Sequence, residues 1–101
     1  MILFDRLEVR QTATYSYWFA GLRDRTARTR IDIRIRRLSL GNPGDVKHVG
    51  ESVSELRAEH GPGYRVYLVQ KQDIYAVLLA GGDKPSQDSD IRQAKALAHD
   101  L

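Results

Sequence analysis

Two arginines flank a tight turn near the middle of the chain, and together they could bind an anion. Arg57 lies in the run before a Gly-Pro-Gly turn and Arg65 lies in the run after it, within the stretch ELRAEHGPGYRVY at residues 55–67. Both runs alternate as antiparallel strands do, which places Arg57 opposite Arg65 or Tyr67 on one face of a strand pair. Two like charges in that position repel by up to about 1 kcal/mol. An anion between the guanidinium groups would relieve the repulsion.

The same strand face also carries two carboxylates. Glu55 and Glu59 alternate with Arg57 along the first run, so their side chains point to the side on which the arginines lie. An exposed lattice of these charges would neutralise both arginines without any ligand. The spacing therefore leaves two interpretations open, an anion site and a structural charge network.

Three further features could contribute to a site. His60, beside the turn, could act as a general base. The stretch at residues 81–84, Gly-Gly-Asp-Lys, opens a helix, where backbone N–H groups and the ammonium of Lys84 would favour an anion. The segment RDRTARTRIDIRIRR, residues 23–37, holds seven arginines in fifteen residues. These arginines could follow a phosphate backbone from one helix face, or they could form a solvated surface.

Composition indicates one small, metal-free domain. A chain of 101 residues can bury one modest core, so we expect a single domain over residues 1–101. It has no cysteine, and His48, His60 and His99 are too scattered to share a metal ion on one helix or loop, which predicts a cytoplasmic, metal-free protein. The first six residues carry two charges and no long apolar run, which predicts neither a signal peptide nor a membrane span. The net charge of +3 points only weakly to a polyanionic partner.

Hydrophobic periodicity predicts a strand and two helices in the first part of the chain. The strand lies at residues 7–11, and Thr12 or Thr14 is placed to cap the helix that follows. Two apolar stripes at helical spacing come next. Their members are Tyr15, Trp18, Phe19 and Leu22 in the first helix, and Ala27, Ile31, Ile35 and Leu38 in the second. A Gly-Asn-Pro-Gly stretch at 41–44 ends the second helix, so the two should form a hairpin.

From Asp45 onward the period changes to two, which predicts an antiparallel meander. Turn residues separate four strand-like runs, at residues 46–49, 53–59, 64–70 and 74–80. The last run, IYAVLLA, is nearly all apolar. It is therefore the best candidate for a central strand, one with a neighbour on each side.

The chain should end in a third helix. Asp83 or Ser86 can cap it, and Asp88 and Asp90 suit the positive end of its dipole. Its packing face would consist of Ile91, Ala94, Leu97 and Ala98. The sequence thus predicts an α+β fold of β-α-α-β-β-β-β-α order with a twisted antiparallel sheet.

Five segments occur in an order and spacing that match a known family. They are WFAGLRDRTARTRI, LSLGNPGDVKHVGESVSELR, HGPGYRVY, LLAGGDK and DIRQAKALA. From about Leu7 to Ala98 the chain resembles the RelE/ParE superfamily of toxin–antitoxin toxins, and within it the HigB-like proteins often called addiction module killer proteins. The family fold has a twisted antiparallel sheet, two N-terminal helices and a C-terminal helix, in agreement with the elements expected above.

The resemblance implies a small ribonuclease that cleaves mRNA, typically in the ribosomal A site, with no metal or other cofactor. It also implies a cognate antitoxin that holds the toxin inactive. A small helix-turn-helix protein encoded by the adjacent gene is the expected antitoxin, and the complex would bind operator DNA through it. Contacts with RNA would come from Arg28, Arg30, Arg34 and Lys47.

The chemistry of such an enzyme needs fixed cations and groups that transfer protons. A ribose 2′-OH attacks the adjacent phosphate in line, and cations aimed at the phosphate oxygens stabilise the charge that grows there. The resemblance assigns that role to Arg57, Arg65 and Lys84. The candidates for proton transfer are His60, Asp90 and Tyr64. Where RelE-type nucleases have a tyrosine in the C-terminal helix, this chain has Ile91, so the choice among the three stays open.

Two other functions are open at the level of the sequence. Some members of the superfamily poison DNA gyrase and lack the nuclease residues, so a toxin that is not a nuclease is the main alternative. A nucleic-acid-binding module with no toxicity would also explain the arginines. The presence of Arg57, Arg65 and Lys84 favours the nuclease over both.

Overall fold

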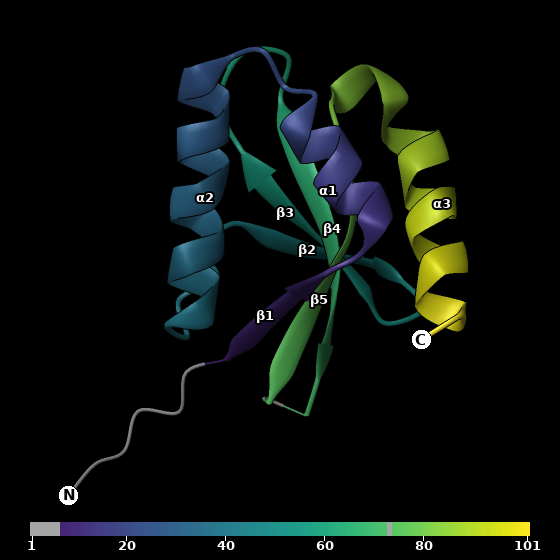
Figure 1. Ribbon diagram of the computed structural model, residues 1–101. Helices are drawn as coiled ribbons and strands as arrows, with labels where there is room; N and C mark the ends of the chain where they lie inside the picture. Colours follow the sequence, from purple (N-terminus) through teal and green to yellow (C-terminus); the bar gives the residue numbers. More distant parts are fainter. Residues whose placement is uncertain (1–6, 73) are drawn as a thin grey trace, which may run out of the picture.

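The computed structural model describes residues 7–72 and 74–101 (Figure 1). Its elements in chain order are β1 (Glu8–Gln11), α1 (Ala13–Ala20), α2 (Arg25–Ser39), β2 (Val46–Gly50), β3 (Val53–Ala58), β4 (Tyr64–Lys71), β5 (Tyr75–Gly82), a short 3-10 turn (Lys84–Ser86) and α3 (Gln87–His99). The predicted α+β class is confirmed. In this part of the chain, none of the helices is both long enough and apolar enough to cross a membrane.

The strands form one sheet in the order β1-β5-β4-β3-β2. From β2 to β5 each strand pairs antiparallel with the next, which confirms the meander. The prediction of a wholly antiparallel sheet is wrong at β1, because β1 runs parallel to β5. Two helices, rather than a hairpin turn, join β1 to the meander, so no tight connection forces it to run opposite to its neighbour.

The prediction that the apolar run IYAVLLA forms a central strand is confirmed. Its residues 75–80 lie in β5, which pairs with β1 on one side and β4 on the other and is buried along almost all of its length. β4 also packs on both sides, with Val66 and Leu68 in one core cluster and Tyr67 and Val69 in the other. A continuous apolar run therefore marks a strand that is covered on both faces.

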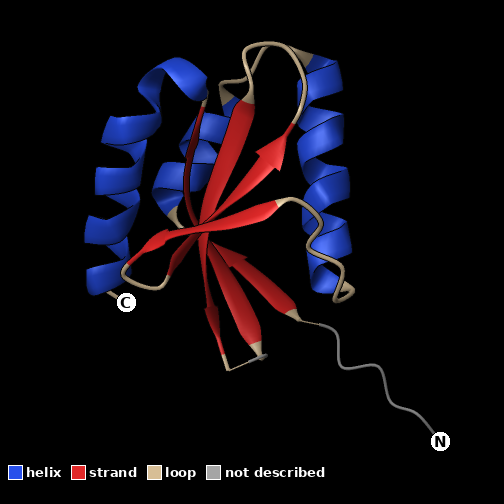
Figure 2. Cartoon of the chain, turned by 180° about the vertical axis from the view of Figure 1, so that it is seen from behind, coloured by secondary structure: helices blue, strands red, loops and turns tan. Residues whose placement is uncertain are grey.

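Helices cover both faces of the sheet (Figures 1 and 2). α1 and α2 pack on one face, where Tyr15, Ile31 and Leu56 belong to the core. α3 packs on the other face through Ala94, and the apolar stripes predicted for all three helices are the ones that pack. Because Tyr67 lies under α3, the strand face that also carries Arg65 is the one that α3 partly covers.

Polar side chains fix where the helices begin. Thr12 Oγ1 accepts a hydrogen bond from the backbone N–H of Tyr15 at 3.1 Å, which confirms Thr12 rather than Thr14 as the cap of α1. Asp24 caps α2 by accepting from two backbone N–H groups of its first turn, at 2.9 and 3.2 Å. Ser86 occupies the N-cap position of α3, one of the two positions expected, but its side chain makes no capping hydrogen bond there. The bonds to Thr12 and Asp24 satisfy donors that a helix start otherwise leaves without partners.

α1 lies so close to β5 that one position of the strand must be glycine. A Cβ atom added to Gly81 would lie 2.2 Å from Cε3 of Trp18. Trp18 packs against Tyr15, with ring centroids 5.8 Å apart, so it has little room to move. Any side chain at position 81 would therefore push α1 away from the sheet.

Gly81→Ala should lower the free energy of unfolding by about 1–3 kcal/mol, because the added methyl group overpacks the contact with Trp18. Urea unfolding followed by tryptophan fluorescence measures the change. Gly21→Ala is the matched control, since a Cβ at Gly21 would meet Tyr17 O at an ordinary 3.4 Å. Equal stability of the two variants would contradict the close approach of α1 to β5.

Candidate functional site

A buried carboxylate, Glu55, connects β3, β4 and α3 on the α3 face of the sheet. Its side chain has no solvent exposure. Glu55 Oε2 accepts from Arg57 Nε at 3.0 Å, and Oε1 accepts from Gln87 Nε2 at 2.8 Å and from the Tyr67 hydroxyl at 3.3 Å. Arg65 Nε lies 3.3 Å from Oε1. Each oxygen of this carboxylate therefore has a cationic group beside it.

The two arginines lie directly opposite each other, as the alternation predicts. Arg57 pairs with Arg65 across β3 and β4. The hydrogen bond from Arg57 to Glu55 raises the pKa of the Arg57 guanidinium. Of the two acids considered from the sequence, Glu55 does neutralise both arginines, but in a buried network rather than an exposed lattice. Within the described residues Glu59 is exposed and forms no ion pair with either arginine.

Tyr67 completes the buried network. Burial raises the pKa of the Tyr67 phenol above its usual range, and the neighbouring charge of Glu55 raises it further. The phenol thus stays protonated and serves as a hydrogen-bond donor to Glu55. The network joins two strands and a helix through groups that are each costly to bury alone.

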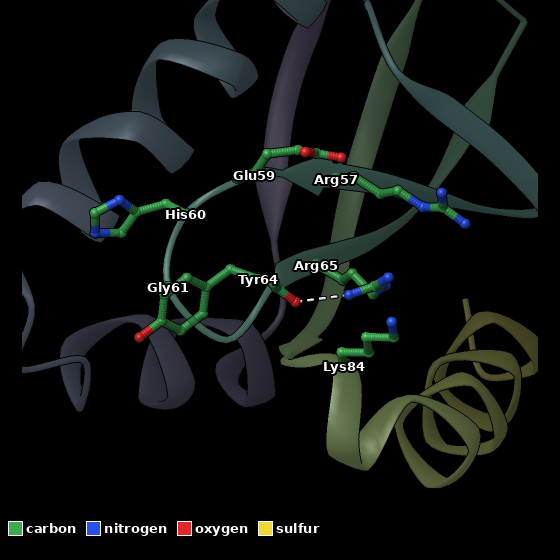
Figure 3. Close-up of a pocket in the computed structure, with 9 residues that line it drawn as sticks. Arg57, Glu59, His60, Gly61, Tyr64, Arg65 and Lys84 are labelled. Atoms are coloured by element: carbon green, nitrogen blue, oxygen red, sulfur yellow. Dashed lines mark hydrogen bonds between the residues drawn. The ribbon is translucent and has the colours of Figure 1, made fainter.

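A hollow of about 390 Å³ lies over the turn between β3 and β4 (Figure 3). Its lining consists of Arg57, Ala58, Glu59, His60, Gly61, Gly63, Tyr64, Arg65 and Lys84. Five of the six residues predicted for catalysis, all except Asp90, are therefore brought together. In Figure 3 the charged ends of Arg57, Arg65 and Lys84 lie on one side of the turn, and His60 lies on the other.

The turn itself holds Arg65 in place. Arg65 Nη1 donates to the carbonyl oxygen of Gly63 at 2.7 Å. Gly63 has φ +82°, and a Cβ there would lie 3.1 Å from that nitrogen, so the position requires glycine. Arg65 is only 8% exposed, and its Nε makes no hydrogen bond within the described part of the chain. The guanidinium is thus held in one orientation, with its buried Nε beside Glu55 rather than open to the hollow.

Lys84 supplies a third cation from a different part of the chain. Its backbone N–H donates to Pro62 O at 3.3 Å, which links the start of the 3-10 turn to the β3–β4 turn. The residue is exposed. In residues 7–72 and 74–101 its ammonium has no ion-pair partner. Three cations therefore surround the hollow with two carboxylates nearby, which leaves an excess of positive charge.

His60 is held by an acid that the sequence analysis did not identify as a site residue. His60 Nε2 lies 2.9 Å from Oδ2 of Asp24, the cap of α2. Hydrogen bonds from the Ala27 N–H and from His60 lower the pKa of the Asp24 carboxyl. An acidic residue before a helical stripe is a recognisable capping signal, but no local pattern indicates its contact with a histidine 36 residues away.

Asp90 does not line the hollow. Its Oδ2 accepts a hydrogen bond from Ser86 Oγ. A Cβ added to Gly82 would lie 1.8 Å from the same oxygen, so Asp90 presses the first turn of α3 against β5. Its contacts give it a role in packing α3, and Ile91 next to it packs into the core on the same side.

The residues predicted to contact RNA divide into two groups. Arg34 is occupied structurally, since its guanidinium donates to backbone carbonyls of Arg57, Pro43 and Asp45. Arg30 and Lys47 are exposed and Arg28 is half-exposed. Lys47 pairs with Glu55 across β2 and β3, so it stands on the same face as Arg57. Lys47 can therefore extend the positive surface of the hollow, whereas Arg28 and Arg30 lie on α2.

The arrangement suits an anion more than a metal ion. Among the described residues no three His, Cys, Asp or Glu side chains are grouped to hold a metal. The cations are of two kinds. Arg65 supplies a planar guanidinium group held by the turn, and Lys84 supplies an exposed ammonium group. Such a set matches the oxygens of a phosphate group.

A curated protein of Haemophilus influenzae is similar to the chain over nearly its whole length. It is described as an uncharacterized protein and is 44% identical over 95 residues, which is 94% of this chain and 96% of the relative. No protein-family model matches the chain, and no solved structure does.

Glu55→Gln should lower the free energy of unfolding by about 3 kcal/mol, because it leaves the buried Arg65 without a counter-charge. The matched control is Glu59→Gln, which removes an exposed carboxylate from the same end of the sheet and should change stability by less than about 0.5 kcal/mol. Urea unfolding of both variants measures the difference. A Glu55→Gln protein as stable as Glu59→Gln would show that the network does not hold the fold.

Proposed function

We propose that this chain, which belongs to the same family as the Haemophilus influenzae protein, is the toxin of a type II toxin–antitoxin module. Its fold would be that of the RelE/ParE superfamily in the HigB-like branch, and its activity that of a ribosome-dependent mRNA endoribonuclease. The observation that carries the proposal is the grouping of Arg57, Arg65 and Lys84 around one hollow with an excess of positive charge.

The reaction proposed for this hollow is an internal transesterification of RNA. The 2′-oxygen of a ribose forms a bond to the adjacent phosphorus, and the bond from phosphorus to the 5′-oxygen of the next nucleotide breaks. A base takes the proton of the 2′-OH and an acid gives one to the 5′-oxygen, so the products are a 2′,3′-cyclic phosphate and a 5′-OH end. The atoms balance without a metal ion or another cofactor.

The cations have distinct parts in this proposal. Arg65 is fixed by Gly63 and Glu55, so it can offer oriented donors to the non-bridging oxygens with little reorganisation. Arg57 is about one-third exposed and can approach the same phosphate from β3. Lys84 is flexible and can follow the charge as it develops.

Two of the three candidates for proton transfer line the hollow. These are His60 and Tyr64, whereas Asp90 lies outside it and is hydrogen-bonded to Ser86. His60 is the stronger candidate, because an imidazole can both accept and donate a proton near neutral pH. Asp24 would act as its positioning residue by holding Nε2.

The partners follow from the proposed activity. The substrate would be mRNA in the ribosomal A site, in the cytoplasm, with Arg28, Arg30 and Lys47 available for further phosphate contacts. A cognate antitoxin, a small helix-turn-helix protein encoded by the adjacent gene, would neutralise the toxin and bring the complex to operator DNA. No membrane takes part in the proposal.

Lys84 offers a cleaner test of the site than Arg65. Replacing Arg65 by alanine would also remove a counter-charge of the buried Glu55, so a loss of activity could reflect misfolding. The sequence alone suggests that Arg65 lies on an open polar face, but its 8% exposure shows that this expectation is wrong. The exposed Lys84 side chain has no such structural partner within the described chain.

Lys84→Ala should reduce the rate of mRNA cleavage by about 10- to 100-fold, because one hydrogen bond to a charged phosphate contributes about 1.5–3 kcal/mol. The measurement is cleavage of a translated message in a reconstituted ribosomal system. Lys71→Ala changes another exposed lysine, at the end of β4 away from Tyr64 and Arg65, and should cleave at the unaltered rate. Cleavage by Lys84→Ala at the same rate as Lys71→Ala would remove Lys84 from the site and weaken the proposal.

A further inference from the structure

An aromatic ring lies at the edge of the hollow, across the turn from the cations. Tyr64 is the first residue of β4 and is half-buried. It pairs with Ala58, so its side chain lies on the α1–α2 face, whereas the next residue, Arg65, lies on the α3 face. Both residues line the hollow, which therefore extends around the rim of the sheet.

The ring of Tyr64 is held by its surroundings. Its edge contacts Trp18, with ring centroids 6.4 Å apart and planes at 61°. A Cβ added to Gly61 would lie 3.7 Å from Tyr64 Cε2, so the bare backbone of the turn passes beside the ring. In residues 7–72 and 74–101 its hydroxyl makes no hydrogen bond, and in Figure 3 the hydroxyl points away from Arg65 and Lys84. The position suits a stacking surface better than a proton donor to a phosphate on the cations.

We propose that Tyr64 is a nucleobase platform, which stacks on a base of the strand whose phosphate Arg57, Arg65 and Lys84 bind. The inference rests on the proposed function and deepens it, since it names the substrate class of the hollow as single-stranded RNA with an unstacked base. Consecutive residues of one strand point to opposite faces, so a nucleotide that crosses the rim can place its phosphate on one side and its base on the other.

The chemistry of the rim supports this substrate class. A π-face with basic groups beside it is the usual combination in sites for single-stranded nucleic acid. Bases in a duplex stack on one another and cannot reach a side-chain ring without leaving the helix. Tyr64 contributes a stacking face and no directed hydrogen bond, so it tolerates any base and prefers those that stack strongly.

The test compares two decamers that carry the same number of phosphates. One is a fluorescent oligoadenylate, and the other has abasic riboses in place of every nucleoside. The unaltered protein should bind the oligoadenylate about 5- to 150-fold more tightly, which corresponds to about 1–3 kcal/mol of stacking. Tyr64→Leu should lose this preference and bind both decamers equally. Tyr64→Phe keeps the ring and should retain the preference.

Equal binding of the two decamers by the unaltered protein, or a preference that survives Tyr64→Leu, overturns the platform. Loss of the preference in Tyr64→Phe overturns it too, because the hydroxyl would then be the active group. The abasic decamer tests the cations separately: Lys84→Ala should weaken its binding, and an unchanged affinity would contradict the proposed function instead. The comparison on the unaltered protein stands even if Tyr64→Leu does not fold.

Discussion

The buried charge of Glu55 is the constraint on which the rest of the site depends. A carboxylate with no solvent exposure is very costly unless cations and donors surround it. Here the partners come from β3, β4 and α3, namely Arg57, Arg65, Tyr67 and Gln87. Once these elements have come together, both guanidinium groups must lie beside the β3–β4 turn. The packing of the fold and the position of its positive hollow therefore follow from one interaction.

The same interaction limits and shapes what the arginines can do. Glu55 offsets part of their charge, so a ligand competes with a resident carboxylate for Arg57 and Arg65. In exchange, the Arg65 guanidinium is held in one orientation by Gly63 and Glu55, and a donor that is already oriented needs little reorganisation when charge develops beside it. Lys84 differs from both, since it is exposed and has no ion-pair partner among the described residues. Two arginines held by Glu55, together with the exposed Lys84, are consistent with the phosphate chemistry proposed.

Local patterns in the sequence predict much of this molecule, for identifiable reasons. The alternation of side chains along two neighbouring runs is enough to place Arg57 opposite Arg65. Helical spacing is enough to find the faces through which the helices pack on the sheet. The burial of Glu55 cannot be predicted from such patterns, because a glutamate that alternates with apolar residues is expected on the exposed face of a strand. Its bond to Gln87 spans 32 residues, and the contact of His60 with Asp24 spans 36, so neither leaves a local signal. The parallel pairing of β1 depends on how two helices cross the sheet, which periodicity does not encode.

We propose that this hollow cleaves mRNA during translation. Mapping 5′ ends by primer extension, after brief induction in a bacterial host that lacks the antitoxin, tests it directly. The account predicts discrete new ends inside translated reading frames, and none in a matched message whose start codon has been removed. Intact messages in cells that nevertheless stop growing would contradict the claim, and broken chromosomal DNA in those cells would indicate a gyrase poison.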